Sequence, residues 1–148
     1  MFHLFQKLYS QLYISHQVHE EVVVAGAGLP GASEVAQSKW IEVKGLKNQA
    51  ELPAAKQQFP FGDGELSTIL LAKELAADRV LLDDYGARKL ARAEGLKVAG
   101  SVGILEESYR RGHLADLRAA FQQLITHHVY IDRRLLERRL RSLGLPPL

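Results

Sequence analysis

The chain has 148 residues, which is enough to bury one hydrophobic core, and we expect a single domain over residues 1–148. It contains no cysteine, which excludes disulfides and thiolate metal sites, and no apolar run reaches the roughly 18 residues typical of a membrane-spanning helix. The net charge of +2 is too small to indicate a nucleic-acid partner by itself. Because the start also lacks a signal-peptide pattern, we expect a cytoplasmic protein.

Helical and extended patterns alternate along the chain. Apolar residues at helical spacing, with caps such as Ser15 and breaks such as Gly95 and Gly112, predict most of the helices. Helices are predicted over residues 1–10, 16–24, 32–38, 48–58, 65–76, 85–94, 101–111, 114–126 and 132–143, and strands over residues 11–14, 40–43, 79–82 and 97–99. The alternation from residue 65 to residue 111 predicts parallel βαβ units, with helices on both faces of an α/β sheet.

Two acids follow the predicted buried strand at residues 79–82. Ligands in open α/β sheets bind beyond the carboxyl ends of the strands, so Asp83 is a candidate functional residue. Asp84 is more simply explained as the cap of the next helix.

A second acidic segment contains glycines. Gly62 and Gly64 allow a sharp turn into a helix that carries Glu65, which we expect to face Asp83 across the edge of the sheet. Two carboxylates that face each other closely repel unless a proton or a cation lies between them. Mg²⁺ is a suitable cation because it prefers oxygen ligands. Glu20 and Glu21 lie on an earlier helix, where a solvated face is the simpler explanation.

The glycines at residues 26–31 fit a dinucleotide-binding fingerprint. Gly26, Gly28 and Gly31 follow an apolar run and would cradle a pyrophosphate at a helix N-terminus. The following helix is short, however, and the unit over residues 22–43 is smaller than the roughly 30 residues of a βαβ unit. A dinucleotide-binding protein is therefore the least favoured hypothesis.

Basic residues gather in two places. Arg88, Lys89 and Arg92 follow Asp83 on the next helix, where they could contact a nucleic acid near the acids. The arginines near the C-terminus form either a solvated helix face or a phosphate-contacting patch, since guanidinium groups bind phosphate oxygens well.

Three ordered motifs are similar to those of a PIN-like family. The segment GDGELSTILLA at residues 62–72 resembles its G-x-G-E-x-x-x-I-x-L-A motif, LLDDYGAR at residues 81–88 resembles L-L-D-[DE]-x-x-A-R, and LKVAGSVGIL at residues 96–105 resembles G-L-x-V-x-G-[TS]-x-G-[VI]-L. The earlier ISHQVHEEV at residues 14–22 is similar to I-P-x-x-V-x-x-E-V. The resemblance covers most of the chain.

The resemblance implies a three-layer α/β/α fold with a mainly parallel sheet. It also implies a Mg²⁺- or Mn²⁺-dependent endoribonuclease of toxin–antitoxin type, with RNA as substrate and an antitoxin protein as partner. Residue by residue, it marks Glu21, Glu65 and Asp83 as catalytic and metal-binding acids, and Asp84 as an auxiliary metal ligand or a cap.

This sequence departs from the family pattern at its start. Family members begin with a strand of the form V-V-S-D-[ST]-S-P-[LI], whose aspartate is a metal ligand and which lies in the middle of the sheet. The sequence as given starts inside the helix that follows, so either the true start lies upstream or this is a shortened relative. For a shortened relative, the resemblance implies unpaired strand edges and an impaired metal site. Two consequences are expected: repair by formation of a homo-oligomer, such as a dimer, or a non-enzymatic RNA- or protein-binding role on the same scaffold.

Overall fold

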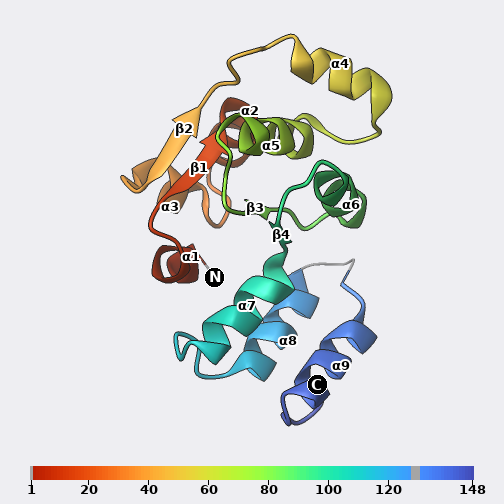
Figure 1. Cartoon of the computed structure of the whole chain (residues 1–148). Helices are drawn as coiled ribbons and strands as arrows, with labels where there is room; N and C mark the ends of the chain where they lie inside the picture. Colours follow the sequence, from red (N-terminus) through yellow and green to blue (C-terminus); the bar gives the residue numbers. More distant parts are fainter. Residues whose placement is uncertain (1, 128–130) are drawn as a thin grey trace. The chain divides into compact units, whose positions relative to one another are not determined.

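The computed structural model describes residues 2–127 and 131–148. Two compact units make up this part of the chain, and Figure 1 shows their elements. One unit consists of Tyr9–Gly100 with Phe2, and the other of His3–Leu8 with Ser101–Leu148. The acids singled out from the sequence all fall in the first unit, and the C-terminal arginines fall in the second.

The unit Tyr9–Gly100 is α/β, and each of its strands is separated from the next by helix. Its elements in order are β1 (Leu12–Ser15), α2 (His16–His19), the π-helix η1 (Glu20–Ala25), α3 (Ala32–Gln37), β2 (Ile41–Lys44), α4 (Glu51–Gln58), α5 (Asp63–Glu74), β3 (Val80–Leu81), α6 (Tyr85–Ala93) and β4 (Val98–Ala99). This order confirms the predicted alternation of strands and helices.

The strands form two parallel pairs, β1 with β2 and β3 with β4. Leu82 N–H donates to the Ala99 carbonyl over 3.0 Å, which extends the second pair by one residue beyond the strand. Parallel pairing is therefore confirmed. Within the described residues, β1 and β3 each have one pairing strand, so one edge of each has no strand partner.

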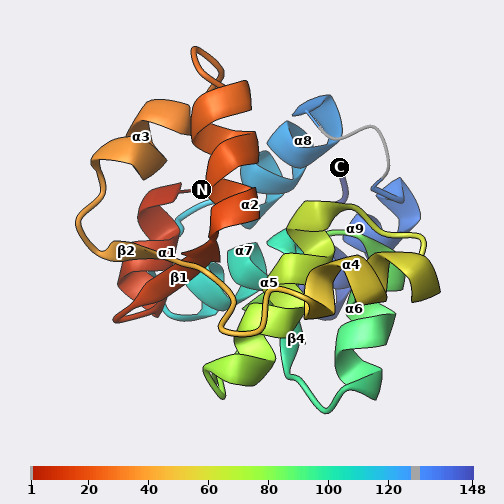
Figure 2. The ribbon, with the colours of Figure 1, turned by 90° about the horizontal axis from the view of Figure 1, so that it is seen from above.

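Helix α5 lies at the centre of this unit. It buries six of its twelve residues and contributes to two apolar clusters. Ile69 and Ala72 pack with Val80 of β3 and Ala87 of α6, while Leu66 and Leu71 pack with residues that include Leu52 of α4. Figure 2 shows α4 and α5 side by side. Because α5 is held from several sides, its first turn is a fixed platform for polar side chains.

The helix after β1 begins as predicted and then changes type. Ser15 caps it, since the Ser15 hydroxyl accepts a hydrogen bond from Val18 N–H over 3.1 Å. After four residues the α-helix widens into η1. A π-helical segment shifts the register of the side chains and is often found at functional sites, and here it carries Glu20 and Glu21.

Three predicted helix starts were wrong by two or three residues. Helix α4 begins at Glu51 rather than at residue 48, where the Asn48 side chain accepts the N–H of Ala50 over 3.2 Å. Helix α5 begins at Asp63 rather than at Glu65, because Gly62 adopts the extended conformation of an N-cap. Helix α8 begins at Leu117 rather than at residue 114, because the Asp116 carboxylate accepts the N–H of Ala119 over 2.8 Å.

The second unit is helical. It contains α1 (Phe2–Leu8, with His3–Leu8 assigned to this unit), α7 (Ser101–Arg110), α8 (Leu117–His127) and α9 (Arg133–Ser142). Its core contains Leu4, Leu105, Leu117, Phe121, Leu124, Leu136 and Leu140. The nearly buried carboxylate of Glu106 is paired with Arg139 at 3.3 Å, which ties α7 to α9. None of the helices in the described residues is long and apolar enough to cross a membrane.

Candidate active site

The Glu21 carboxylate lies against the first turn of α5. A Cβ atom placed on Gly64 would stand 2.7 Å and 2.9 Å from the two carboxylate oxygens of Glu21. That space is open only because residue 64 is glycine. Gly64 is buried while Glu21 is exposed, so the carboxylate covers the start of α5 and remains accessible to water.

The Glu65 carboxylate lies against the same turn. A Cβ atom on Gly62 would stand 2.9 Å from its Oε2 atom. The two glutamates, which are far apart in the sequence, therefore each lie against the first turn of α5 or the residue before it. The partial positive charge of that helix N-terminus favours carboxylates beside it.

Hydroxyl groups hold this turn in place. The Ser67 and Thr68 hydroxyls donate to the Gly64 carbonyl at 3.1 Å and 2.7 Å, respectively. The Ser67 and Ser15 hydroxyl oxygens are 2.7 Å apart, and both side chains are buried. This hydrogen bond between the two hydroxyls ties the end of β1 to the turn that the glutamates lie against.

Asp84 caps α6. Its Oδ1 atom accepts the N–H of Ala87 over 2.7 Å, which satisfies one free donor of the first turn. The interpretation of Asp84 as a helix cap is therefore confirmed. Its other interpretation, as an auxiliary metal ligand, stays a prediction.

Asp83 lies at the end of β3 beside Gly100. A Cβ atom on Gly100 would stand 3.1 Å from both Asp83 Oδ1 and Arg88 Nη1. The same guanidinium nitrogen donates to the carbonyl oxygens of Asp83 and Leu82, at 2.5 Å and 3.4 Å. Arg88 therefore secures the turn that presents Asp83. Lys89 and Arg92, the other predicted nucleic-acid contacts, are exposed on α6.

The segment before α5 contacts the first turn of α6. The Phe61 ring lies so close to Gly86 that a Cβ atom there would be 2.8 Å and 3.0 Å from two ring carbons. The N-termini of α5 and α6 are thus neighbours. Glu21 and Glu65 lie against the start of α5, and Asp83 and Asp84 directly precede α6. Gly64 and Gly86 were not predicted as site residues, although the G-x-G-E spacing was a signal for the first.

The donor set suits a hard cation only in part. Two carboxylates at one turn match Mg²⁺, which is bound through one or two protein carboxylates and keeps several waters. However, the described residues contain no group of three or more potential metal ligands. The arrangement therefore supports Glu21 with Glu65 as a pair and does not assemble Asp83 with them.

The glycines at residues 26–31 do not have the context of a dinucleotide site. Such a site needs a strand before the glycines and a helix after them. Residues up to Ala25 are π-helical instead, and α3 has only six residues. Gly28 and Gly31, with φ of 83° and 93°, serve a turn that only glycine makes without strain.

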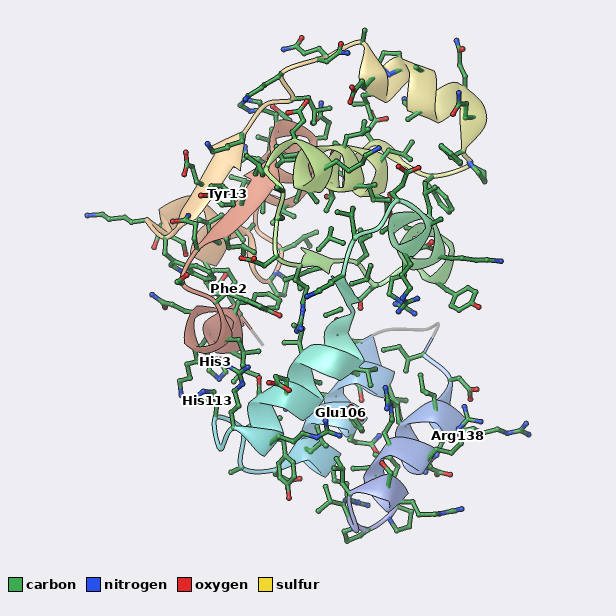
Figure 3. The ribbon with its side chains drawn as sticks, viewed as in Figure 1. Phe2, His3, Tyr13, Glu106, His113 and Arg138 are labelled. Atoms are coloured by element: carbon green, nitrogen blue, oxygen red, sulfur yellow. The ribbon has the colours of Figure 1, made fainter. Side chains whose placement is uncertain are left out.

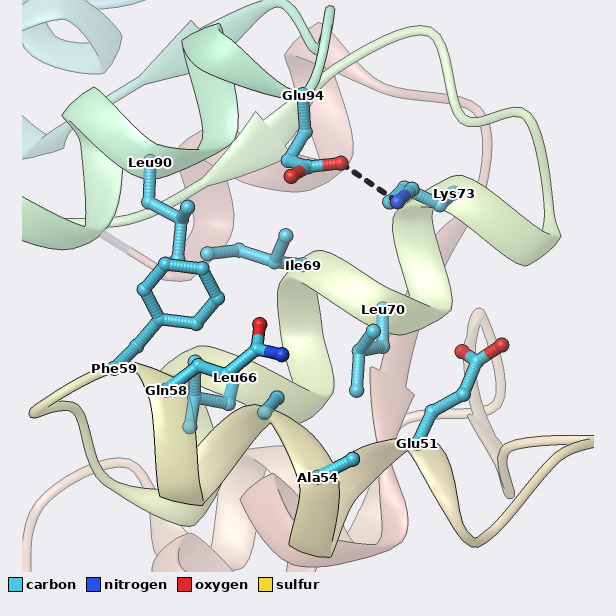
Figure 4. Close-up of a pocket in the computed structure, with 11 residues that line it drawn as sticks. Glu51, Ala54, Gln58, Phe59, Leu66, Ile69, Leu70, Lys73, Leu90 and Glu94 are labelled. Carbon is cyan, nitrogen blue, oxygen red and sulfur yellow. Dashed lines mark hydrogen bonds and ion pairs between the residues drawn. The ribbon is translucent and has the colours of Figure 1, made fainter.

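An apolar cavity of about 230 Å³ lies between α4, α5 and α6 (Figure 4). Phe59, Leu66 and Leu90 are among the residues that line it, and the Lys73–Glu94 ion pair of 2.7 Å lies at its rim. None of the four candidate acids lines this cavity. The four candidate acids therefore lie outside this cavity.

Comparison with known proteins gives one match. The model of the DUF3368 family, described as a PIN domain, matches residues 1–145. No curated protein and no solved structure matches the chain. The family match covers both compact units and nearly the whole length, and it agrees with the α/β order, the parallel strands and the acids at the starts of α5 and α6. The chain therefore belongs to this PIN domain family.

Proposed function

We propose that this protein is a divalent-metal-dependent ribonuclease of PIN type. The observation that carries the proposal is that Glu21 and Glu65, remote in sequence, both lie against the start of α5 in a chain that matches a PIN domain. The match through both units also supports the proposal that residues 1–148 are one domain.

The roles of the residues follow from their positions. Glu21 and Glu65 would hold Mg²⁺ or Mn²⁺, which when bound polarises a phosphodiester and lowers the pKa of a bound water. The family resemblance adds Asp83 as a third ligand. The hydroxyls of Ser15, Ser67 and Thr68 fix the turn under the glutamates. Asp84 and Arg88 fix the turn that carries Asp83, which keeps that carboxylate near the start of α6.

A cleavage assay with matched variants tests this proposal. The wild-type chain should cleave single-stranded RNA with Mn²⁺ and stop when EDTA is added. Glu21→Gln, Glu65→Gln and Asp83→Asn should each lower the rate by about a hundredfold or more, because each removes a charged ligand.

Glu20→Gln is the matched control. Glu20 is the exposed neighbour of Glu21 on η1, and its side chain makes no hydrogen bond or ion pair with the described residues, so its loss should leave the rate unchanged. Equal losses in Glu20→Gln and Glu21→Gln, or cleavage that persists in EDTA, would contradict the proposal.

A second candidate is an RNA-binding module that does not cleave. It is favoured by the absence of a group of three metal ligands among the described residues. In that case RNA affinity would be the same in EDTA and in Mn²⁺, and the three acid variants would bind as the wild type does.

The biological role proposed from the family resemblance is that of a cytoplasmic toxin, held inactive by an antitoxin protein and acting as a homo-oligomer such as a dimer. Growth arrest on expression of the wild type, absent with Glu65→Gln, would support the toxin role.

A further inference from the structure

Three arginines form a stripe on α9. Arg134, Arg138 and Arg141 occupy positions i, i+4 and i+7, which lie on one face of an α-helix. All three are exposed, and Figure 3 shows the Arg138 side chain extending away from the helix. Leu136 and Leu140 lie on the opposite face and are fully buried. We name these three arginines the arginine stripe.

The other two arginines of α9 are used within the unit. Arg133 pairs with Glu137 at 3.1 Å and donates to the Leu148 carbonyl, and Arg139 pairs with Glu106. The members of the stripe have no acidic partner among the described residues. Each pair of like charges at these spacings destabilises a helix by about 0.2–0.5 kcal/mol. The repulsion within the stripe therefore weakens the free helix, and a bound polyanion would reduce that repulsion.

We propose that the arginine stripe is a binding site for the phosphate backbone of RNA and that this binding does not depend on the base sequence. The choice of nucleic acid rests on the proposed function, whereas the anion site rests on α9 alone. A guanidinium fork matches phosphate oxygens in geometry and in charge.

Two other kinds of partner, a membrane surface and a protein, fit α9 less well. A helix that lies on a membrane inserts its apolar face, but Leu136 and Leu140 are buried in the core of this unit. A protein interface has an apolar or aromatic centre, and no such side chain separates the arginines of the stripe.

The length of the stripe sets the size of the effect. At 1.5 Å per residue, Arg134 and Arg141 are separated by about 10 Å along the helix axis. At about 3.4 Å per phosphate along one strand, that length faces about three phosphates. Three neutralised phosphates contribute a slope of about −2 to log K against log salt for a single strand.

The test is fluorescence anisotropy of a labelled oligouridylate in EDTA, titrated over a range of salt concentrations. The triple variant Arg134→Gln, Arg138→Gln, Arg141→Gln should raise the Kd by about tenfold or more and reduce the magnitude of the salt slope by about 2. Glutamine is a good helix former, so α9 should persist, which circular dichroism checks. If it does not, the single variant Arg138→Gln should raise the Kd and reduce the slope by about 1.

The control removes the same charge elsewhere. Lys39, Lys47 and Lys97 are exposed in the other unit, and their ammonium groups make no ion pair there. The triple lysine-to-glutamine variant should bind RNA nearly as the wild type does. Equal losses of RNA affinity in the two triple variants would show that only the net charge matters, and this result would overturn the proposal. An unchanged Kd in the arginine variant would overturn it as well.

A parallel arm uses vesicles of phosphatidylserine. Vesicle binding that depends on the stripe, with RNA binding unaffected, would overturn the RNA assignment. Because every binding measurement is made in EDTA, failure of metal-dependent cleavage leaves this test unaffected, and loss of stripe-dependent binding leaves the cleavage test unaffected.

Discussion

At the scale of single residues, Gly64 is the position on which the candidate active site depends most. The Glu21 carboxylate fills the space of the missing Cβ atom. We predict that Gly64→Ala displaces this carboxylate and weakens Mn²⁺ binding by about tenfold or more. A displaced metal ligand lowers the affinity for the metal in the same way as a removed one. Isothermal titration calorimetry measures the change.

The stability of the Gly64→Ala variant separates displacement from misfolding. The clash is with the mobile end of a side chain, and alanine favours a helix over glycine by up to about 1 kcal/mol, so the melting temperature should hold or rise. Gly103→Ala on α7 is the matched control, since a Cβ atom there meets nothing within 4 Å. Weaker Mn²⁺ binding in both variants, or in neither, would count against the role of the Glu21 cradle.

The sequence predicted the acids better than it predicted their supports. Charged residues at strand ends and after glycines are visible as patterns, and Asp83 and Glu65 were proposed in this way, whereas Glu21 was marked only by the family resemblance. The contacts of Ser15 with Ser67, and of Phe61 with Gly86, join segments far apart in the chain. They depend on packing that no local pattern contains.

At the scale of elements, the start of α6 depends on Asp84. The variant Asp84→Ala removes the hydrogen bond to Ala87 N–H and should lower the free energy of unfolding by about 1 kcal/mol. Asp84→Asn keeps an accepting oxygen and should cost only a few tenths, as measured by urea denaturation.

The asparagine variant also tests the metal role of Asp84. A residue that acts only as a cap leaves Mn²⁺ affinity unchanged in Asp84→Asn, since the shape and the hydrogen bond remain. Weaker Mn²⁺ binding with unchanged stability would show instead that Asp84 is a ligand as well as a cap.

Helices were predicted more closely than the sheet. Every predicted helix is present, because helical spacing and caps such as Ser15 are local. The π-helix η1 was not predicted, since the same apolar pattern suits α- and π-helical turns. The division into two parallel pairs depends on which strands meet, and strand patterns of two to four residues do not encode that.

At the scale of the whole molecule, charge is divided between the two units. The unit Tyr9–Gly100 carries twelve acidic and ten basic side chains, whereas His3–Leu8 with Ser101–Leu148 carries five acidic and nine basic ones. The near-neutral total of +2 conceals this division. A cation site and a phosphate site of opposite character can therefore belong to one small chain.

Hydrogen exchange followed by mass spectrometry tests this division of roles on the intact protein. Mn²⁺ should slow exchange in η1 and the first turn of α5, where Glu21 and Glu65 lie, because a bound ligand suppresses local opening. RNA added in EDTA should slow exchange in α9, and the triple arginine variant should lose that protection. Protection of α9 by Mn²⁺ alone, or protection by RNA confined to Tyr9–Gly100, would place the two ligands on other surfaces. Protection in the expected places would assign the cation to the glutamate pair and the phosphates to the arginine stripe.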